Sequence, residues 1–251
     1  MRERLCRRRV GERALGLSAV VVLLAALVGA AVTAAPAAAD TKPARLTVTA
    51  QKKTVKWGAA LILNGVLVED VLPPVALDQK NVQVQRSPNG SDPWTLVDMV
   101  TNDSAPYSSG AYTYTEPASR TYHWRMFFAG DAEWAPAIGT VVKVSVKPVL
   151  GKPSCPSRVK AKKKFIVKGS LKPRFKAGSK PVKITCQRYV KRSWRTFKTF
   201  KAAAANSGAY SKYSVRISIA RKGKFRFVAT TATTGSYAAA KSAYSRKLTV
   251  K

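Results

Sequence analysis

The sequence predicts an all-β protein with two similar antiparallel β-sandwich domains behind an N-terminal signal peptide. Three observations carry this prediction. Short stretches alternate between apolar and polar residues, separated by Gly, Pro, Asn and Ser, which is typical of strands with one buried face. Landmarks of the first half recur about 100 residues later, which indicates an internal duplication. The chain also opens with a basic stretch, an apolar run and a small-residue exit.

Residues 1–39 have the three-part layout of a secretory signal. The basic stretch MRERLCRRR precedes an apolar run, which ends at the A-x-A exit Ala37-Ala38-Ala39. We expect cleavage after Ala39. An uncleaved membrane anchor is the alternative, because an apolar run of about 19 residues can span a bilayer. No later segment approaches that length, so the mature chain is expected to lack a transmembrane segment and to be secreted, extracellular or associated with the cell envelope.

Two cysteines would remain once the signal, which carries Cys6, is removed: Cys155 and Cys186. In an oxidising compartment such a pair forms a disulfide more often than a metal site. A bridge would close a loop of about 30 residues and contribute about 3 kcal/mol; two buried thiols are the alternative. No histidine or carboxylate lies nearby in the sequence to complete a zinc shell, so we expect no metal and no cofactor.

The internal repeat defines the expected domain organisation. Its matched landmarks are residues 82–87 with 182–187, Trp94-Thr95-Leu96 with Trp194-Arg195-Thr196, and Ser109-Gly110-Ala111-Tyr112 with Ser207-Gly208-Ala209-Tyr210. Strands are expected in the first copy at residues 46–49, 61–67, 82–86, 94–100, 111–115, 121–128 and 141–147. Seven strands in about 105 residues is the spacing of an immunoglobulin-like sandwich. We therefore expect sandwiches at residues 40–148 and 154–251, joined by a linker at 149–153, with one turn of helix as an option at residues 201–205.

Several motifs carry a family resemblance. They are GSLKPR at 169–174, GSKPVKI at 178–184, SKYS at 211–214 and GKFR at 223–226 in the second half, and WTLV at 94–97 and FAGDAEW at 128–134 in the first. The chain resembles the tandem immunoglobulin-like repeats of secreted and surface proteins of bacteria over nearly all of its length after residue 39. This resemblance implies Ig-like sandwiches that act as spacers or as adhesion and binding modules, and no catalytic residues transfer with it. The antibody cysteine pattern is not met, because Cys155 precedes the expected second strand and Cys186 lies on the third.

Charge is distributed very unevenly along the chain. Residues 40–150 hold 11 Lys and Arg against 10 Asp and Glu, whereas residues 151–251 hold 28 Lys and Arg and no acid. Without carboxylates to screen it, the second half should produce a strong positive potential. Period-two alternation places many of these cations on the solvent side of strands. The expected anion-binding face consists of Lys164, Lys168, Lys172, Arg174, Lys183, Lys224 and Arg226.

The charge favours a binding role over catalysis. We expect salt-dependent association with anionic envelope polymers, extracellular polymers or lipid headgroups; the alternative is a structural or adhesive spacer whose charge is merely solvated. Sequence-specific nucleic-acid binding is not expected, because no helix suits the major groove and no RNP motif is present. The acid-free half contains no histidine either, so it offers no catalytic carboxylate pair or Ser–His–Asp arrangement. The chain is therefore not expected to be an enzyme.

The first half leaves two minor options open. Asp131 and Glu133 are close in loop-like sequence, but two carboxylates are few for a Ca²⁺ site. The tryptophans near turns could stack on sugar rings and make the first domain a glycan binder; they are Trp57, Trp94 and Trp134. Trp124 has the strand parity of a core residue, whereas His123 is expected on the solvent side.

Overall fold

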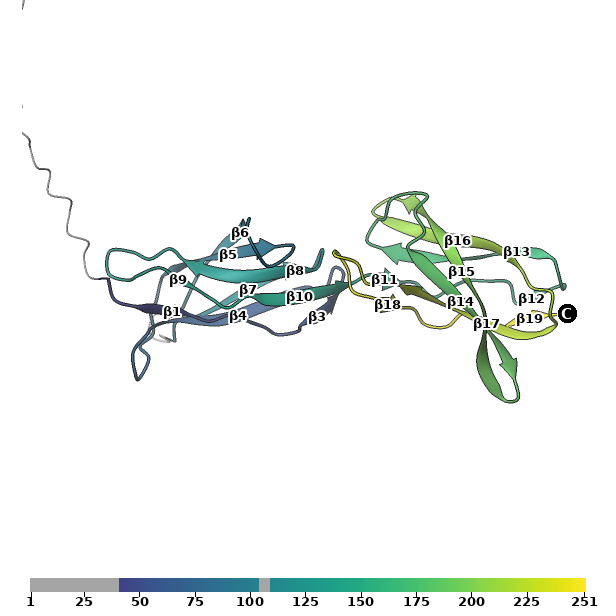
Figure 1. The fold of residues 1–251 in the computed structure, drawn as a ribbon, viewed down its shortest axis with the longest axis horizontal. Coiled ribbons are helices and arrows are strands. Elements are labelled where there is room, and N and C mark those ends of the chain that lie inside the picture. The colour runs from purple at the N-terminus through teal and green to yellow at the C-terminus, as the bar shows by residue number, and fades with distance from the viewer. Residues whose placement is uncertain (1–40, 104–108) are drawn as a thin grey trace, which may run out of the picture. The chain divides into compact units, whose positions relative to one another are not determined.

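The computed structural model describes residues 41–103 and 109–251, and these residues contain strands but no helix (Figure 1). They belong to one compact unit, Ala39–Lys251. The predicted signal peptide, with its cleavage position, lies outside the described residues. Within the described ranges, no helix is long and apolar enough to cross a membrane. The all-β prediction is confirmed.

Two sheets enclose the first hydrophobic core. One has the order β1–β4–β2 with β7 beside β4, and the other has the order β3–β10–β8–β5–β6 with β9 beside β8. Their strands are β1 (Ala44–Leu46), β2 (Thr49–Ala50), β3 (Thr54–Lys56), β4 (Ala60–Glu69), β5 (Asn81–Ser87), β6 (Thr95–Thr101), β7 (Ala111–Pro117), β8 (Tyr122–Phe128), β9 (Ala137–Ile138) and β10 (Val142–Lys147). The strand expected at residues 46–49 is divided into β1 and β2, the other six expected strands are present, and β3 and β9 are additional. Alternation sets the buried side, because Trp124, Met126 and Phe128 of β8 are all in the core, as predicted for Trp124.

The second core lies between two layers that one long strand connects. The order is β11–β13–β16–β15–β14–β17–β19–β12, with β18 beside β17. These strands are β11 (Val149–Leu150), β12 (Arg158–Val159), β13 (Lys164–Lys172), β14 (Val182–Val190), β15 (Ser193–Ser207), β16 (Tyr210–Ser218), β17 (Gly223–Thr231), β18 (Ala240–Lys241) and β19 (Leu248–Val250). The first part of β15 pairs with β14 and the last part pairs with β16. Strand β15 therefore passes from one layer to the other.

The optional helical turn at residues 201–205 is wrong. These residues continue β15, where Ala202 and Ala204 are buried and Lys201 and Ala205 are exposed. An alanine run favours helix by intrinsic propensity, but burial on alternate positions and pairing first with β14 and then with β16 decide in favour of strand.

The two copies share most of their strand pairing, although β15 pairs with β16 while its counterpart β6 does not pair with β7 among the described residues. Strands β4, β5, β6, β7, β8 and β10 correspond to β13, β14, β15, β16, β17 and β19. In both copies the last of these strands pairs in parallel with a short strand, β3 or β12, so the sheets are mixed and not purely antiparallel. A register shift follows Val84 in β5 and Cys186 in β14. The duplication read from the sequence is therefore a duplication of structure.

The structural match differs in register from the sequence landmarks. The register shifts place Val84 and Cys186 at equivalent positions in the two copies. The sequence landmarks instead pair Val84 with the residue two positions before Cys186. Each copy also has a tyrosine that lies opposite a glycine of the neighbouring strand. Tyr112 is opposite Gly65 in the first copy, and Tyr213 is opposite Gly169 in the second, so the two tyrosines are equivalent. The repeated SGAY motif had aligned Tyr112 with a residue three positions earlier. Loop lengths differ between the copies, so identical letters near turns do not hold the strand register.

The segment predicted as a linker, residues 149–153, pairs with the second set of strands. β11 pairs with the end of β13, and the Tyr213 hydroxyl donates a hydrogen bond to the Gly151 carbonyl at 2.8 Å. This segment therefore forms an edge of the second sandwich-like unit.

Candidate anion-binding site

The seven residues predicted as one basic face lie on two layers. Lys164, Lys168 and Lys172 are exposed on β13, while Lys183, Lys224 and the half-buried Arg226 lie on β14 and β17. The inward neighbours of both groups enter one core, so the outward side chains of the two layers point away from each other. Arg174 follows β13 and is exposed. Period-two alternation correctly separated outward from inward residues, but it carries no information on which layer a strand joins.

The structure instead brings part of this set into a groove beside β13. Adjoining cavities of about 440 and 620 Å³ share Pro156, Lys164 and Phe165. A third cavity of about 330 Å³ shares Ser154 and Cys155 with the second. We call the three together the basic groove. Its cationic lining residues are Lys152, Arg158, Lys160, Lys163, Lys164, Lys168, Arg216, Arg246 and Lys251.

Backbone pairing explains how the groove forms. Ser154 and Lys168 exchange two backbone hydrogen bonds, of 2.7 and 3.1 Å, which fix the start of the segment to the β13 layer. A few residues later β12 pairs with β19, in the other layer. The segment of residues 152–160 thus crosses between layers, and the groove lies between it and β13. This crossing brings cations from distant parts of the sequence together.

No acidic side chain lines the groove. Ion pairs among the described residues involve only residues between 42 and 133, and residues 151–251 contain no Asp or Glu. The nine cations of the groove therefore have no Asp or Glu of their own half of the chain to pair with. Such a site attracts anions strongly and at long range at low ionic strength.

The two described cysteines are free thiols, so the predicted disulfide is not present in this structure. Cys155 lines the groove, and its Sγ is 3.9 Å from the Arg246 carbonyl oxygen. Cys186 is fully buried in the second core, where burial raises the pKa of its thiol to about 12. Burial also raises the pKa of the Cys155 thiol, which a hydrogen bond with Ser245 partly opposes. The alternative of two buried thiols holds for Cys186 but not for Cys155, which is half-buried.

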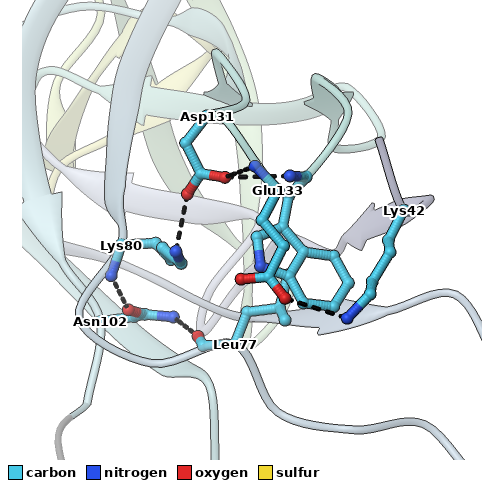
Figure 2. A network of polar contacts seen from close by, with 7 residues as sticks. Lys42, Leu77, Lys80, Asn102, Asp131 and Glu133 are labelled. Carbon is cyan, nitrogen blue, oxygen red and sulfur yellow. Dashed lines mark hydrogen bonds and ion pairs between the residues drawn. The ribbon is translucent and has the colours of Figure 1, made fainter. Parts of the chain in front are cut away.

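The acidic residues considered for Ca²⁺ are already paired with lysines (Figure 2). Asp131 accepts a 2.6 Å hydrogen bond from Lys80 Nζ and further bonds from the backbone N–H groups of Glu133 and Trp134. Glu133 accepts a 2.9 Å bond from Lys42 Nζ. No cluster of three or more potential metal ligands occurs among the described residues. These carboxylates hold a loop in place and do not converge on an ion site.

Acid should weaken this lysine–aspartate network. The hydrogen bond from Lys80 holds the pKa of Asp131 below its ordinary value. A lowered folded-state pKa stabilises the fold above the unfolded-state pKa, and this stabilisation is lost as pH falls through the folded-state pKa. We expect a loss below about pH 4 of under about 1 kcal/mol, because such partly exposed pairs contribute little. Urea titrations between pH 3 and 6 should show a steeper pH dependence for wild type than for Asp131→Asn; equal slopes would contradict this role.

The tryptophans proposed for sugar binding are not free platforms. Trp134 is buried at 7% exposure and Trp57 packs against the first core. Trp94 is half-buried, and the guanidinium of Arg125 covers it at 4.3 Å from the ring centroid. The glycan-binding reading of the first half thus loses the exposed rings that it required. His123 lies on the side of β8 opposite the buried Trp124, as expected, but it is half-buried there, and its Nδ1 is buried without a hydrogen-bond partner among the described residues.

Sequence reasoning missed a stacked cluster on the β14–β17 layer. The Arg226 guanidinium carbon lies 4.5 Å from the Trp194 ring centroid and 3.7 Å from that of Tyr244, and Arg226 Nε donates a 2.8 Å hydrogen bond to Gln187. We call these four residues the arginine stack. Trp194 was noticed as a repeat landmark. Aligning the copies in the structural register matches Gln187 with Gln85 and Arg226 with Arg125. It does not reveal Tyr244, because no second ring stacks on Arg125 among the described residues.

No protein-family model matches the chain, and no curated protein matches its sequence.

Proposed function

We propose that the chain is a secreted, non-catalytic protein whose second Ig-like sandwich, residues 154–251, binds anionic polymers of the cell envelope or the extracellular space in the basic groove. The observation that carries this proposal is the groove itself, with nine cations and no acid in that half of the chain. A spread of solvated lysines would not require such convergence from five separate stretches of sequence.

Strand pairing supports the Ig-like part of the proposal. Strands β4 and β7 in one sheet, with β5, β8 and β10 in the other, occupy the places of strands B and E and of C, F and G in an Ig sandwich. The second copy repeats this pairing. The proposed secretion depends on the signal-like residues 1–39, which lie outside the described residues.

A groove suits a linear polymer better than a small anion. Its three cavities adjoin one another along the segment of residues 152–160 and are open to solvent, so a chain could contact several cations in succession. Each cation near an anionic surface contributes on the order of 1 kcal/mol. Several weak contacts of this kind give useful affinity at low salt and lose it as salt rises.

The test compares two pairs of exposed lysines. Lys163→Glu/Lys164→Glu reverses charge in the groove, and Lys52→Glu/Lys53→Glu makes the same change in the first half. Binding of the full chain to linear polyphosphate is measured by calorimetry over a salt series. We expect the groove variant to bind at least tenfold more weakly at low salt, with the slope of log K against log salt reduced by about 2. The control variant should stay within about threefold of wild type.

Two outcomes would overturn the proposal. If wild type binds no polyanion at low salt, the charge serves solubility and the chain is better described as a spacer. If both lysine variants weaken binding equally, net charge alone acts and the groove is not the site.

A further inference from the structure

The outward side of the layer that contains β14, β15 and β17 combines cations with aromatic rings. Arg226 points outward between the buried Phe225 and Phe227. Directly opposite it on β14 is Gln187, which accepts its Nε hydrogen bond. Trp194 and Tyr244 stack on its guanidinium, and Tyr189 lies against Trp194 with ring centroids 5.1 Å apart. Arg226 is therefore held at Nε and by two rings.

The two terminal nitrogens of the Arg226 guanidinium remain available to bind a ligand. The two terminal nitrogens of Arg226 donate no hydrogen bond to other described residues, and residues 151–251 contain no Asp or Glu to pair with them. Arginine presents these N–H groups as a planar fork that fits two oxygens of one oxyanion. A fork already fixed in position loses little side-chain entropy when it binds.

A row of lysines lies on the same side of the layer as the stack. Lys201 on β15 is opposite Lys183 on β14, and Thr230 on β17 lies between Lys183 and Lys241. This row crosses four strands about 13 Å along β14 from Gln187. Lys241 also reaches the stack, because its Nζ lies 5.6 Å from the ring centroid of Tyr244, the ring that stacks on Arg226.

We propose that the arginine stack is a phosphate-recognition site, at which Arg226 binds phosphoryl groups of an anionic polymer through its fork. This inference rests on the proposed polyanion binding and adds a second, chemically selective contact on the other layer. A carboxylate gripped by the fork has both oxygens in the guanidinium plane. A phosphoryl group gripped in the same way directs its other oxygens elsewhere, where a lysine such as Lys241 can pair with them.

The first copy supplies an internal comparison. Arg125 is stacked over Trp94 at 4.3 Å, and its Nε donates a 2.8 Å hydrogen bond to Gln85. No second ring stacks on Arg125 among the described residues. Exposed apolar side chains occupy the same side of that sheet, namely Leu96, Met99 and Ile138. The Trp–Arg–Gln unit is therefore common to both copies, and only the second adds Tyr244 and the lysine row.

The experiment exchanges each arginine for lysine in the full chain. Arg226→Lys keeps the charge but removes the fork, and Arg125→Lys makes the same change in the first copy. Calorimetry at fixed low salt measures binding to linear polyphosphate and to polyglutamate of matched charge. We expect Arg226→Lys to weaken polyphosphate binding about tenfold and polyglutamate binding by less than threefold. Arg125→Lys should leave both unchanged. Tyr244→Leu, which loosens the fork without touching its charge, should weaken polyphosphate binding several-fold.

Each other result decides against the inference. If Arg226→Lys binds polyphosphate as wild type does, only charge matters on this layer, while a loss in the Lys163→Glu/Lys164→Glu variant would leave the proposed function standing. Equal losses in the two arginine variants would show that the stack only supports the fold. Equal losses for both polymers would make the site a general oxyanion site without phosphate selectivity. Absence of wild-type binding to either polymer would overturn this inference together with the proposed function.

Discussion

Replacing Phe227 with alanine is expected to lower the free energy of unfolding of the second sandwich by about 3–5 kcal/mol. Phe227 is fully buried, and its ring meets that of Phe165 edge-on with centroids 6.3 Å apart. It also lies opposite the buried Cys186 on β14. Truncation would therefore leave a cavity at the point where side chains of both layers interdigitate, and strands on all sides limit its collapse.

The matched control for this change is Phe197→Ala. Phe197 lies on β15 and is 38% exposed, and its ring meets that of the buried Phe225 edge-on with centroids 5.5 Å apart. Its removal should cost about 1–2 kcal/mol, clearly less than that of Phe227. Urea denaturation followed by circular dichroism gives the stabilities, and hydrogen exchange with mass spectrometry locates the loss to β13–β17. Similar losses for the two variants, or lost protection in β4–β8 instead, would contradict the assignment of Phe227 to the second core.

Gly169→Ala should destabilise the same unit by about 1–3 kcal/mol through overpacking. A methyl group on Gly169 would collide with the hydroxyl end of the Tyr213 ring. That ring is itself held, because it is fully buried and its hydroxyl donates to the Gly151 carbonyl at 2.8 Å. Moving Tyr213 aside would therefore break this hydrogen bond and detach the segment that contains β11.

A double-mutant cycle distinguishes two causes of this destabilisation: the collision of the new methyl group with Tyr213, and the change in backbone freedom on replacing a glycine. In a Tyr213→Leu background the alanine should cost much less, because the ring that it meets is gone. Gly235→Ala, at a position with open space around the glycine, should change the unfolding midpoint little. An equal penalty for Gly169→Ala in both backgrounds would show that tyrosine packing is not its cause. Gly65 and Tyr112 repeat this pairing in the first copy. Gly65→Ala should also destabilise, but Tyr112→Leu should relieve only part of the cost, because the added methyl would also meet the Thr47 carbonyl oxygen.

Local sequence pattern was sufficient for the strands and for their buried sides. On β13, for example, Phe165, Val167 and Leu171 are buried while Lys164 and Lys168 are exposed, because alternation is a property of each strand by itself. The same reasoning located Trp124 in the first core. Strand β3 was missed because three residues are too few to show a period.

The candidate sites depend on pairing between distant strands, and no local pattern records it. Lys168 and Lys183 had the same outward parity, yet β13 and β14 belong to different layers. The groove exists because the segment of residues 152–160 crosses between layers, and the arginine stack needs Gln187, Trp194 and Tyr244 from three separate stretches. The disulfide prediction failed for a related reason. An oxidising compartment and two cysteines favour a bridge, but they do not determine whether the fold points the Cys155 thiol toward Cys186.

The path of β15 also bears on how each half of the chain resists self-association. In the second half the first part of β15 pairs with β14 and the last part with β16, so each part has one side without a strand partner. That strand carries the exposed Arg195, Lys198 and Lys201, and charged side chains on an edge oppose pairing with another molecule. Its counterpart β6 pairs only with β5 among the described residues, and it carries the exposed Leu96 and Met99. An open apolar edge can recruit a strand from another molecule. At high concentration, intermolecular β-sheet should therefore begin at β6, in the half of the chain that carries almost no net charge to prevent it.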